Sequence, residues 1–383
     1  MATIVPFGPQ HPVLPEPLHL RLVLQDEIVT EALPTLGYVH RGLETLVTLK
    51  DVDQMVQVVE RVCGICSCIH AHNYCMCIED LLGVEVPPRA DFLRIIWSEL
   101  HRMHSHLLWL GLLADAFGME SLFMHCWRIR ERVLDVMEAT AGNRVIMSVN
   151  RVGGTRRDMS DDQLRWVLQV ADELEQELDR IKPVLTNDYT VKKRTVGKGV
   201  LTRDQAYELG AAGPQLRGSG VAQDIRMTGY GGYKYVDFEP VVETDGDSYA
   251  RTLVRFREIY QAIDIIRQLV SKIPRGDIWA KPKGRPEGEI VRRTEQPRGE
   301  LMYYVKASGG KFLDRVRIRT PTFANVPPLL AIHRSTIWRW LQKWRQQNRG
   351  VCFVNANRQQ RKVTPAGYIP GVGAVSQFRL HAC

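Results

Sequence analysis

Hydrophobic residues recur every three or four positions along most of the chain, a spacing that predicts α-helices. The longest run covers residues 91–117 and follows a Pro-Pro pair, with Asp91 as the expected N-cap residue. A second expected helix, residues 120–141, ends at Gly142-Asn143, a pair typical of helix C-termini. Three further helices are expected, and they cover residues 160–181, 202–209 and 249–273.

Shorter stretches alternate hydrophobic and polar residues, which is the pattern of half-buried β-strands. Residues 19–29 follow it with a polar break in the middle, which predicts a hairpin or a pair of short strands. Strands are expected again at 299–306 and 315–319, and the glycine-rich stretch 210–246 is expected to be irregular. The expected fold class is α+β, mainly α: a long-helix core bundle with small β-elements at the N-terminus and near residues 299–319.

The basic residues are concentrated at one end of the chain. The net charge of the 383 residues is +8, yet residues 333–383 hold nine Lys or Arg and no Asp or Glu. Residues 1–332 therefore carry 42 basic against 43 acidic side chains. The predicted organisation is one domain over 1–332 and a divergent basic tail over 333–383. The tail matches no nucleic-acid reader motif, so no nucleic-acid partner is expected.

No apolar run reaches the roughly 18 residues that a membrane-spanning helix needs. The nearest candidate, His106 to Met119, is interrupted by Asp115, and the N-terminus lacks the basic start and apolar core of a secretory signal. A cytoplasmic location is expected, where thiols stay reduced. Five of the eight cysteines fall within fifteen residues, so they are candidate metal ligands or redox groups.

Cys63 and Cys66 form a CxxC pair around a glycine-containing turn. Such a turn directs both sulfurs to one point. They could then serve as two ligands of a thiolate metal site or as a redox dithiol. A pair of buried structural cysteines is the plain alternative. A thioredoxin-like site would need a βαβ setting, which is absent here. A zinc site would need a second pair, and Cys75 and Cys77 are expected to point apart on a helix.

The segment RVCGICSCIHAHN resembles the first cysteine motif of nickel-iron hydrogenase large subunits, RxCGICxxxH. The resemblance implies a nickel-iron centre, with iron carrying diatomic ligands. In it Cys63 would be a terminal nickel ligand and Cys66 a bridge between nickel and iron. His70 would orient a bridging sulfur through a hydrogen bond. The other cysteines of the segment are not ligands in that family and are expected to be buried: Cys68, Cys75 and Cys77.

The resemblance extends over roughly residues 5–332, through motifs such as GPQHP, YVHRGLE, SHLLWLG, GPQLRGSGVAQDIR, EQPRGELMYYV and RIRTPTFAN. These are similar to the branch that energy-converting, membrane-associated hydrogenases share with the 49 kDa subunit of complex I. The chain is thereby identified as a large subunit that would reduce protons to dihydrogen, coupled to ion translocation. Implied partners are an iron-sulfur small subunit with its clusters, other hydrophilic and membrane subunits, and ferredoxin as donor. The complex would lie on the inner face of the cell membrane.

Several residues of this sequence match functional positions of the family. Glu44 matches the glutamate at which a proton pathway leaves the site, although a surface or capping carboxylate is an equal alternative. Arg298 matches the arginine above the metals; its alternative is a structural salt bridge with Glu295 or Glu300. The remaining matches are Pro321 and Thr322, which would line the diatomic ligands, and His11, which faces the quinone head group in complex I.

Two other signals are discounted. The histidines of the long helix lack a Glu or Cys at ligand spacing, so a core or interface role is expected for His101, His104 and His106. The triplet Gly218-Ser219-Gly220 has no strand-turn-helix around it and is not a dinucleotide fingerprint.

The sequence departs from the family after residue 332. The second motif of active members, DPCxxC, is absent, and the cysteines after residue 332, Cys352 and Cys383, are isolated. A shifted reading of the coding region is the favoured explanation. The alternative is a subunit that works without the standard cluster, as in relatives that reduce quinone or sulfur compounds. A third hypothesis is a non-catalytic scaffold for neighbouring subunits.

Overall fold

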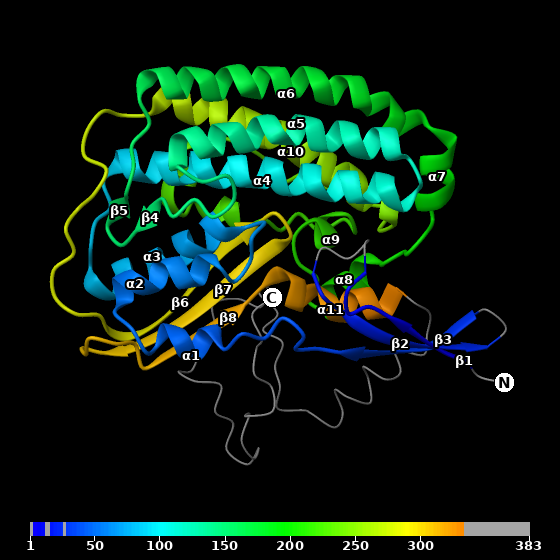
Figure 1. Ribbon diagram of the computed structural model, residues 1–383, viewed down its shortest axis with the longest axis horizontal. Coiled ribbons are helices and arrows are strands. Elements are labelled where there is room, and N and C mark those ends of the chain that lie inside the picture. The colour runs from blue at the N-terminus through cyan, green and yellow to red at the C-terminus, as the bar shows by residue number, and fades with distance from the viewer. Residues whose placement is uncertain (1–2, 12–15, 26–27, 333–383) are drawn as a thin grey trace, which may run out of the picture.

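A layer of long helices covers a small β-sheet in the computed structural model, which describes residues 3–11, 16–25 and 28–332 (Figure 1). Four helices form the layer: α4 (Pro88–Ala116), α5 (Glu120–Ala141), α6 (Asp161–Asn187) and α10 (Ser248–Lys272). Their apolar faces enclose the largest hydrophobic core. This arrangement confirms the predicted helical bundle, and α5 has the predicted bounds.

Helix ends differ from the prediction where proline is involved. Helix α4 begins at Pro88 with Pro87 as its N-cap, so the assignment of Asp91 as N-cap was wrong. Proline suits the first helical position because its missing N–H has no partner there in any case. Helix α6 begins at Asp161, one residue after the predicted start. Ser160 is its N-cap and forms a capping box with Gln163, and the helix continues past the exposed Pro183 to Asn187.

The three-stranded antiparallel sheet below the helices has the order β6 (Glu287–Gln296), β7 (Gly299–Ser308), β8 (Arg315–Arg319). Helix α3 (Ser67–Leu82) contacts β6 and β7, and the buried residues between them form a second hydrophobic core. Strands β7 and β8 were predicted, whereas β6 was not. The pairing of Gln296 with Gly299 leaves Pro297 and Arg298 as a tight two-residue turn.

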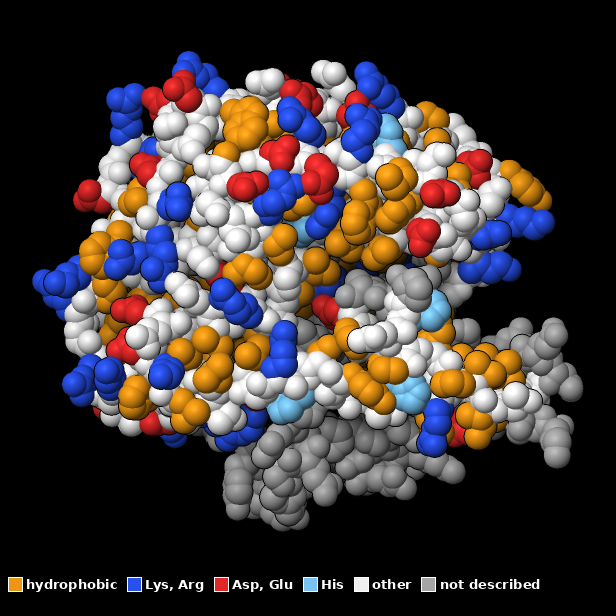
Figure 2. Space-filling view, viewed as in Figure 1, with side chains coloured by type: hydrophobic (Ala, Val, Ile, Leu, Met, Phe, Trp, Pro, Cys, Tyr) orange, Lys and Arg blue, Asp and Glu red, His pale blue; other side chains and the backbone are white. Residues whose placement is uncertain are grey.

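The N-terminal segment forms a separate antiparallel sheet of β1 (Thr3–Phe7), β2 (His19–Gln25) and β3 (Ile28–Thr35). This confirms the predicted strand pair and adds β1, which was not predicted. Figure 2 shows hydrophobic side chains on the surface of this region. The exposed ones of the sheet and of the segment after it are Ile4, Val5, Leu36, Tyr38, Leu46 and Leu49.

Short elements connect these layers. They are α1 (Leu43–Val47), α2 (Val52–Glu60), β4 (Asn150–Arg151), β5 (Gly154–Thr155), α7 (Tyr189–Thr195), α8 (Arg203–Glu208), α9 (Pro214–Arg217), η1 (Ile225–Thr228), η2 (Gly231–Tyr235) and α11 (Pro321–Ile332). The stretch 210–246 contains only α9 and the two 3₁₀ turns, as its glycine content predicted. Within the described ranges, no helix combines the length and apolar character needed to cross a bilayer. The basic tail lies outside the described residues.

A network of buried charged side chains joins α4, α10 and the end of β6. At its centre, Arg217 donates from Nη2 to Glu258 of α10 at 2.7 Å and from Nη1 to Glu295 of β6 at 2.8 Å. These side chains are almost fully withdrawn from solvent. The network continues through Glu99, Asp224 and Arg226. Because removing a charge from water costs several kcal/mol, such a network is stable only with its partners complete.

Candidate functional site at the Cys63–Cys66 turn

The two cysteines of the CxxC motif lie on the turn between α2 and α3. Helix α2 ends at Glu60, and Cys66 is the residue that precedes the first turn of α3. Both thiols are buried, with Cys63 at 7% and Cys66 at 1% exposure. The turn therefore holds two sulfurs beneath the surface instead of presenting them to solvent.

Arg298 faces both sulfurs from the tip of the β6–β7 hairpin. Its Nη2 lies 2.7 Å from Cys63 Sγ and 3.3 Å from Cys66 Sγ. Its Nη1 lies 2.9 Å from a carboxylate oxygen of Glu16. The predicted alternative was a salt bridge of Arg298 with Glu295 or Glu300, but the first binds Arg217 and the second binds Arg319. One guanidinium group therefore joins two thiols and a loop carboxylate.

The two thiols differ in acidity. Burial raises the pKa of the Cys63 thiol, but the hydrogen bond with Cys66 and the charge of Arg298 outweigh it, and the pKa falls below its ordinary value. Burial, the bond with Cys63 and its charge raise the pKa of Cys66 well above that value. The pair thus favours one thiolate stabilised by one thiol and one cation. By contrast, burial raises the pKa of Cys68 to about 12.

The remaining cysteines of the segment are buried, as predicted. Cys68, Cys75 and Cys77 have no exposed surface.

His70 lies in the first turn of α3, four residues after Cys66, and is fully buried. Its Nδ1 is 2.9 Å from the hydroxyl of Tyr303 on β7, and its Nε2 has no hydrogen-bond partner among the described residues. Burial and the nearby charge of Arg298 lower the pKa of His70 to about 3, so the ring is neutral at physiological pH. Its role in orienting the Cys66 sulfur stays a prediction.

Glu44 lies in the first turn of α1 and reaches β8. It pairs with Arg317 at 2.5 Å and accepts a hydrogen bond from the backbone N–H of Ile318 at 2.9 Å. Burial raises the pKa of Glu44 above its ordinary value although both contacts act in the opposite direction. A partly buried carboxyl with a raised pKa is a suitable proton donor or acceptor, and this role stays a prediction.

The other predicted residues belong to α11 and to the segment after β1. Pro321 and Thr322 begin α11, which is attached to the hairpin tip because Asn325 donates from Nδ2 to the Arg298 carbonyl at 3.2 Å. The ring of His11 lies 4.4 Å from that of Phe7, between β1 and the segment outside the described residues. The roles proposed for these three residues stay predictions.

Three residues that hold Arg298 in place were missed by sequence reasoning. Glu16 binds the guanidinium, Asn325 binds the carbonyl, and Gly213 packs against the turn so closely that a side chain has no room. Gly213 and Asn325 lie in two of the motifs that resemble the family, GPQLRGSGVAQDIR and RIRTPTFAN. Nothing in the sequence shows that both residues contact Arg298. Glu16 lies in none of these motifs, so nothing in the sequence indicates its contact with Arg298.

Replacing Gly213 by alanine is expected to lower the free energy of unfolding by about 2–4 kcal/mol. Gly213 has φ +64°, and an added Cβ would lie 2.3 Å from Gly299 Cα and 2.6 Å from the Arg298 carbonyl oxygen. Denaturant unfolding measures the loss. Gly83→Ala is the control for a positive φ without a close contact, because Gly83 has φ +63° and nothing within 4 Å of the added Cβ. Equal losses in both variants would show that the contact with the turn carries no energy.

The described residues do not complete the metal site of the hydrogenase motif. A nickel-iron centre of that kind needs four thiolates, and the turn brings two. Across 3–11, 16–25 and 28–332, no group of three or more His, Cys, Asp or Glu side chains is arranged to hold a metal ion. Cys352 and Cys383 lie outside those ranges. The turn therefore supplies two of the thiolates of such a centre.

The three histidines of α4 contribute to packing and to the ion network. His106 Nε2 lies 2.8 Å from Glu258, and His104 Nδ1 accepts from Arg130 at 3.0 Å. His101 lies against the backbone of Gly64 in the cysteine turn. All three are buried, as predicted for core residues.

Comparisons with known proteins agree with the fold. Residues 116–285 and 279–337 match the family model of the respiratory-chain NADH dehydrogenase 49 kDa subunit, and residues 41–115 match that of nickel-dependent hydrogenase. The chain is 39% identical to the carbon monoxide-induced hydrogenase of Rhodospirillum rubrum, over 84% of this chain and 90% of the relative. It is 36% identical to the membrane-bound hydrogenase subunit alpha of Pyrococcus furiosus, over 84% and 80%.

A solved structure also resembles the chain. It is a chain of the membrane-bound sulfane sulfur reductase, an archaeal respiratory membrane complex, with 30% identity and a TM-score of 0.80. The match covers 88% of this chain and 97% of that one. The fold is thus the one found in subunits of membrane-bound respiratory complexes, and the named relatives are oxidoreductases. The chain belongs to the family that unites the large subunits of membrane-bound nickel-iron hydrogenases with the 49 kDa subunit of complex I.

Proposed function

We propose that this chain is the large subunit of a membrane-associated hydrogenase complex and passes electrons from an iron-sulfur partner subunit to protons. The observation that carries the proposal is the contact of one guanidinium, Arg298, with both sulfurs of the CxxC turn at 2.7 and 3.3 Å. Two thiols can supply thiolate ligands to a metal. A fixed cation beside them stabilises negative charge that develops on the sulfurs. Two similar relatives are named as hydrogenases, which supports the choice of protons as acceptor.

The partners follow from the same proposal. An iron-sulfur small subunit would dock near the turn and receive electrons from ferredoxin. The exposed hydrophobic residues of the N-terminal sheet and of α1 would be covered by other subunits, because large exposed apolar areas usually mark interaction surfaces. With no described helix able to cross a bilayer, attachment to the inner face of the membrane would be peripheral, and ion translocation would belong to the membrane subunits.

A second candidate is a quinone or sulfur reductase subunit that works without a complete nickel-iron centre. The observation that favours it is the lack of a third metal ligand at the turn, within the part of the chain that the structure describes. The similar solved chain comes from a complex named as a sulfane sulfur reductase. Under this candidate the thiol pair itself would take part in electron transfer.

Metal analysis of the purified complex separates the two candidates. The hydrogenase proposal expects about one nickel per large subunit and dihydrogen evolution from reduced ferredoxin. A nickel-free complex that still turns over quinone or a sulfur compound would contradict it and support the second candidate.

Cys63→Ser is expected to reduce the turnover of the complex at least about a hundredfold under either candidate, because the hydroxyl is a poor substitute for a thiolate. Cys126→Ser is the control, since Cys126 is also buried (1% exposed against 7% for Cys63) but lies on α5 and not on the turn. Full activity of the Cys63 variant would reject both candidates. It would leave the chain as a non-catalytic scaffold.

A further inference from the structure

The buried ion network of the helix layer contains one carboxylate more than it contains guanidinium groups. Among the described residues, its ion pairs join the arginines Arg102, Arg217 and Arg226 to the carboxylates Glu99, Asp224, Glu258 and Glu295. None of these seven side chains is more than 2% exposed. With all seven ionised, the interior would hold one uncompensated negative charge, which is very costly.

The neighbouring titratable groups do not supply the missing positive charge. His106 binds Glu258 at 2.8 Å, but burial lowers the pKa of His106 to about 4, so the ring is neutral at pH 7. Burial raises the pKa of Tyr230 and Tyr233, whose phenols stay uncharged as well. Arg255 acts on Glu258 from the same helix, but within the described ranges it forms no ion pair with a carboxylate. The balance therefore has to come from a proton.

The contacts around Arg217 indicate which carboxyl takes this proton. Its Nη1 is shared, at 2.8 Å from Glu295 Oε1 and 3.4 Å from Asp224 Oδ2. Asp224 has a second cation, because Arg226 donates to both of its oxygens, from Nε at 3.0 Å and from Nη2 at 2.7 Å. The other oxygen of Glu295 accepts from an uncharged donor, the backbone N–H of Ile225, at 3.2 Å. Of these two carboxylates, Glu295 therefore has less positive charge beside it.

Each of the other two carboxylates makes two contacts with cations. Glu258 accepts hydrogen bonds from Nε and Nη2 of Arg217 at 2.9 and 2.7 Å. Glu99 lies 3.1 Å from Nε of Arg102 and 3.4 Å from Nη1 of Arg226. Both carboxylates are therefore stabilised in the ionised form, which leaves Glu295 as the carboxyl to be protonated.

The acidity of the two carboxyls that share Arg217 agrees with these contacts. Burial and the charge of Asp224 raise the pKa of Glu295 to about 7, although Arg217 and Arg102 act in the opposite direction. Burial acts to raise the pKa of Asp224 too, but Arg226 and Arg217 outweigh it and lower that pKa to about 2. Asp224 is therefore ionised at neutral pH, while Glu295 gains and loses a proton.

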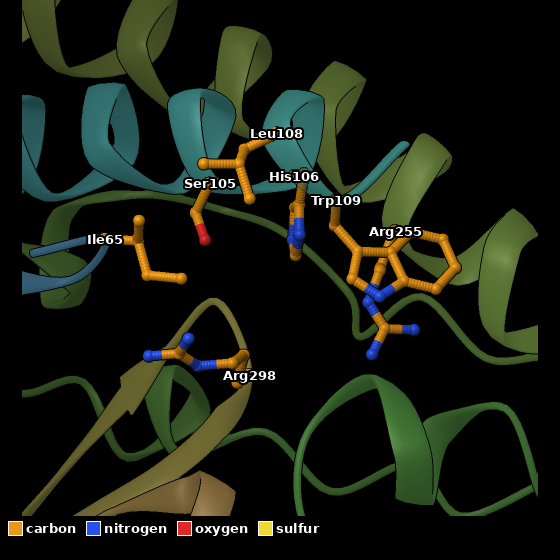
Figure 3. Close-up of a pocket in the computed structure, with 7 residues that line it drawn as sticks. All are labelled: Ile65, Ser105, His106, Leu108, Trp109, Arg255 and Arg298. Atoms are coloured by element: carbon orange, nitrogen blue, oxygen red, sulfur yellow. The ribbon is translucent and has the colours of Figure 1, made fainter. Parts of the chain in front are cut away.

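The network adjoins the thiol site at two places. Glu295 lies on β6 three residues before Arg298, whose guanidinium contacts both sulfurs. His106, the partner of Glu258, lines one small cavity together with Ile65 of the cysteine turn and Arg298 (Figure 3). The carboxyl and the guanidinium at the thiol pair thus belong to the same hairpin tip.

We infer that Glu295 binds an exchangeable proton that balances the buried network and is stored beside the thiol pair. Protonation removes the one negative charge for which the network has no cation, so the carboxyl stays buried without being an unpaired ion. The binding of the proton does not depend on the reaction. Its use as a store rests on the proposed function, in which the thiol site consumes protons.

Infrared spectroscopy of the full chain tests for the proton, because only a protonated carboxyl shows the carbonyl stretch of a carboxylic acid. Burial also raises the pKa of Glu44 and Glu60, so the measured quantity is the native spectrum minus that of Glu295→Gln. A carboxylic-acid band is expected in this difference at pH 5.5, and it should disappear by pH 8.5. Absence of the band at pH 5.5, or an unchanged band at pH 8.5, would overturn the inference.

Two further variants check the charge balance, each measured against its double variant with Glu295→Gln. Glu258→Gln leaves three arginines with three carboxylates, so the band should disappear at a lower pH than in the native chain. Glu289→Gln is the control on the same strand, because Glu289 is exposed and pairs with Lys306, and it should leave the titration unchanged. An unshifted titration in Glu258→Gln would contradict the charge balance on which the assignment rests.

The pH dependence of stability gives a second readout, which also detects a failure to fold. Because the folded-state pKa of Glu295, about 7, lies above the unfolded value of about 4.3, stability is lost as pH rises through the folded pKa. Glutamine resembles the protonated carboxyl, so the urea midpoint of Glu295→Gln should rise relative to the native chain between pH 5 and pH 8. A relative fall, or a variant unfolded at both pH values, would show that Arg217 needs the ionised carboxylate and would overturn the inference.

The pH profile of dihydrogen evolution by the complex tests the store. The native profile is expected to have an inflection near pH 7 that is absent from the profile of Glu295→Gln. Identical profiles would exclude Glu295 as a proton store for the reaction. A complex that evolves no dihydrogen would contradict the proposed function and the store with it, while the infrared difference decides independently whether Glu295 binds the proton.

Discussion

Replacing Arg217 by methionine is expected to lower the free energy of unfolding by about 3–5 kcal/mol. The guanidinium has no exposed surface and binds Glu258 and Glu295 at 2.7 and 2.8 Å. Methionine keeps most of the volume but leaves two buried carboxylates without their cation. The loss therefore comes from uncompensated charge and not from a cavity. Urea or guanidinium chloride unfolding of the chain measures it.

A surface ion pair gives the control for this prediction. Arg165 pairs with Asp162 one helical turn away, and both side chains are more than 70% exposed. Arg165→Met is expected to change stability by less than about 1 kcal/mol. Adding Glu258→Gln to Arg217→Met should restore part of the lost unfolding free energy, because one unpaired buried charge is removed. A loss below about 1 kcal/mol in the Arg217 variant would show that the buried network adds little to stability.

The effect of Arg217→Met should depend on pH. In the native chain, burial acts to raise the pKa of Glu258, but Arg217 and the hydrogen bond with His106 hold it well below its ordinary value. A lowered folded-state pKa stabilises the chain above the unfolded pKa, about 4.3, and this stability is lost as pH falls. Without Arg217 that contribution disappears. The difference between native chain and variant should therefore be larger at pH 7.5 than at about pH 3, below the unfolded pKa.

The sequence predicted those elements whose ends are marked by local chemistry. Helix α5 has the predicted bounds because Gly142 takes the left-handed conformation that ends it. Strand β6 was missed because its outer half is exposed on both faces and its charged residues hide any alternation. Strand β1 was missed for a related reason, since four of its five residues are exposed. Alternation appears only where one face of a strand is buried.

The candidate site could be predicted only in part. Cys63 and Cys66 share one turn, so a local motif finds them, and the family pattern adds Arg298. The contacts that fix Arg298 come from segments far apart in the chain, Glu16, Gly213 and Asn325, which meet only through the tertiary fold.

Replacing Arg298 by methionine is expected to reduce the turnover of the complex by about 10²–10³ fold. The guanidinium lies against both sulfurs, and a cation held there before reaction stabilises negative charge without reorganisation of the site. The loss should appear in kcat, because the charge develops during electron transfer and not on binding. Steady-state assays with the donor in excess measure it.

Two further variants separate this electrostatic role from a structural one. Arg298→Lys keeps the charge but cannot place two nitrogens on the two sulfurs and Glu16 together, so intermediate activity is expected. Arg293→Met is the matched control, because Arg293 lies on β6 of the same hairpin, is 38% exposed and pairs with Glu300. If Arg298→Met lowers the free energy of unfolding while the folded fraction keeps its native kcat, the guanidinium only holds the turn in place. If kcat falls in a variant of native stability and the control is active, the charge itself acts on the reaction at the thiol pair.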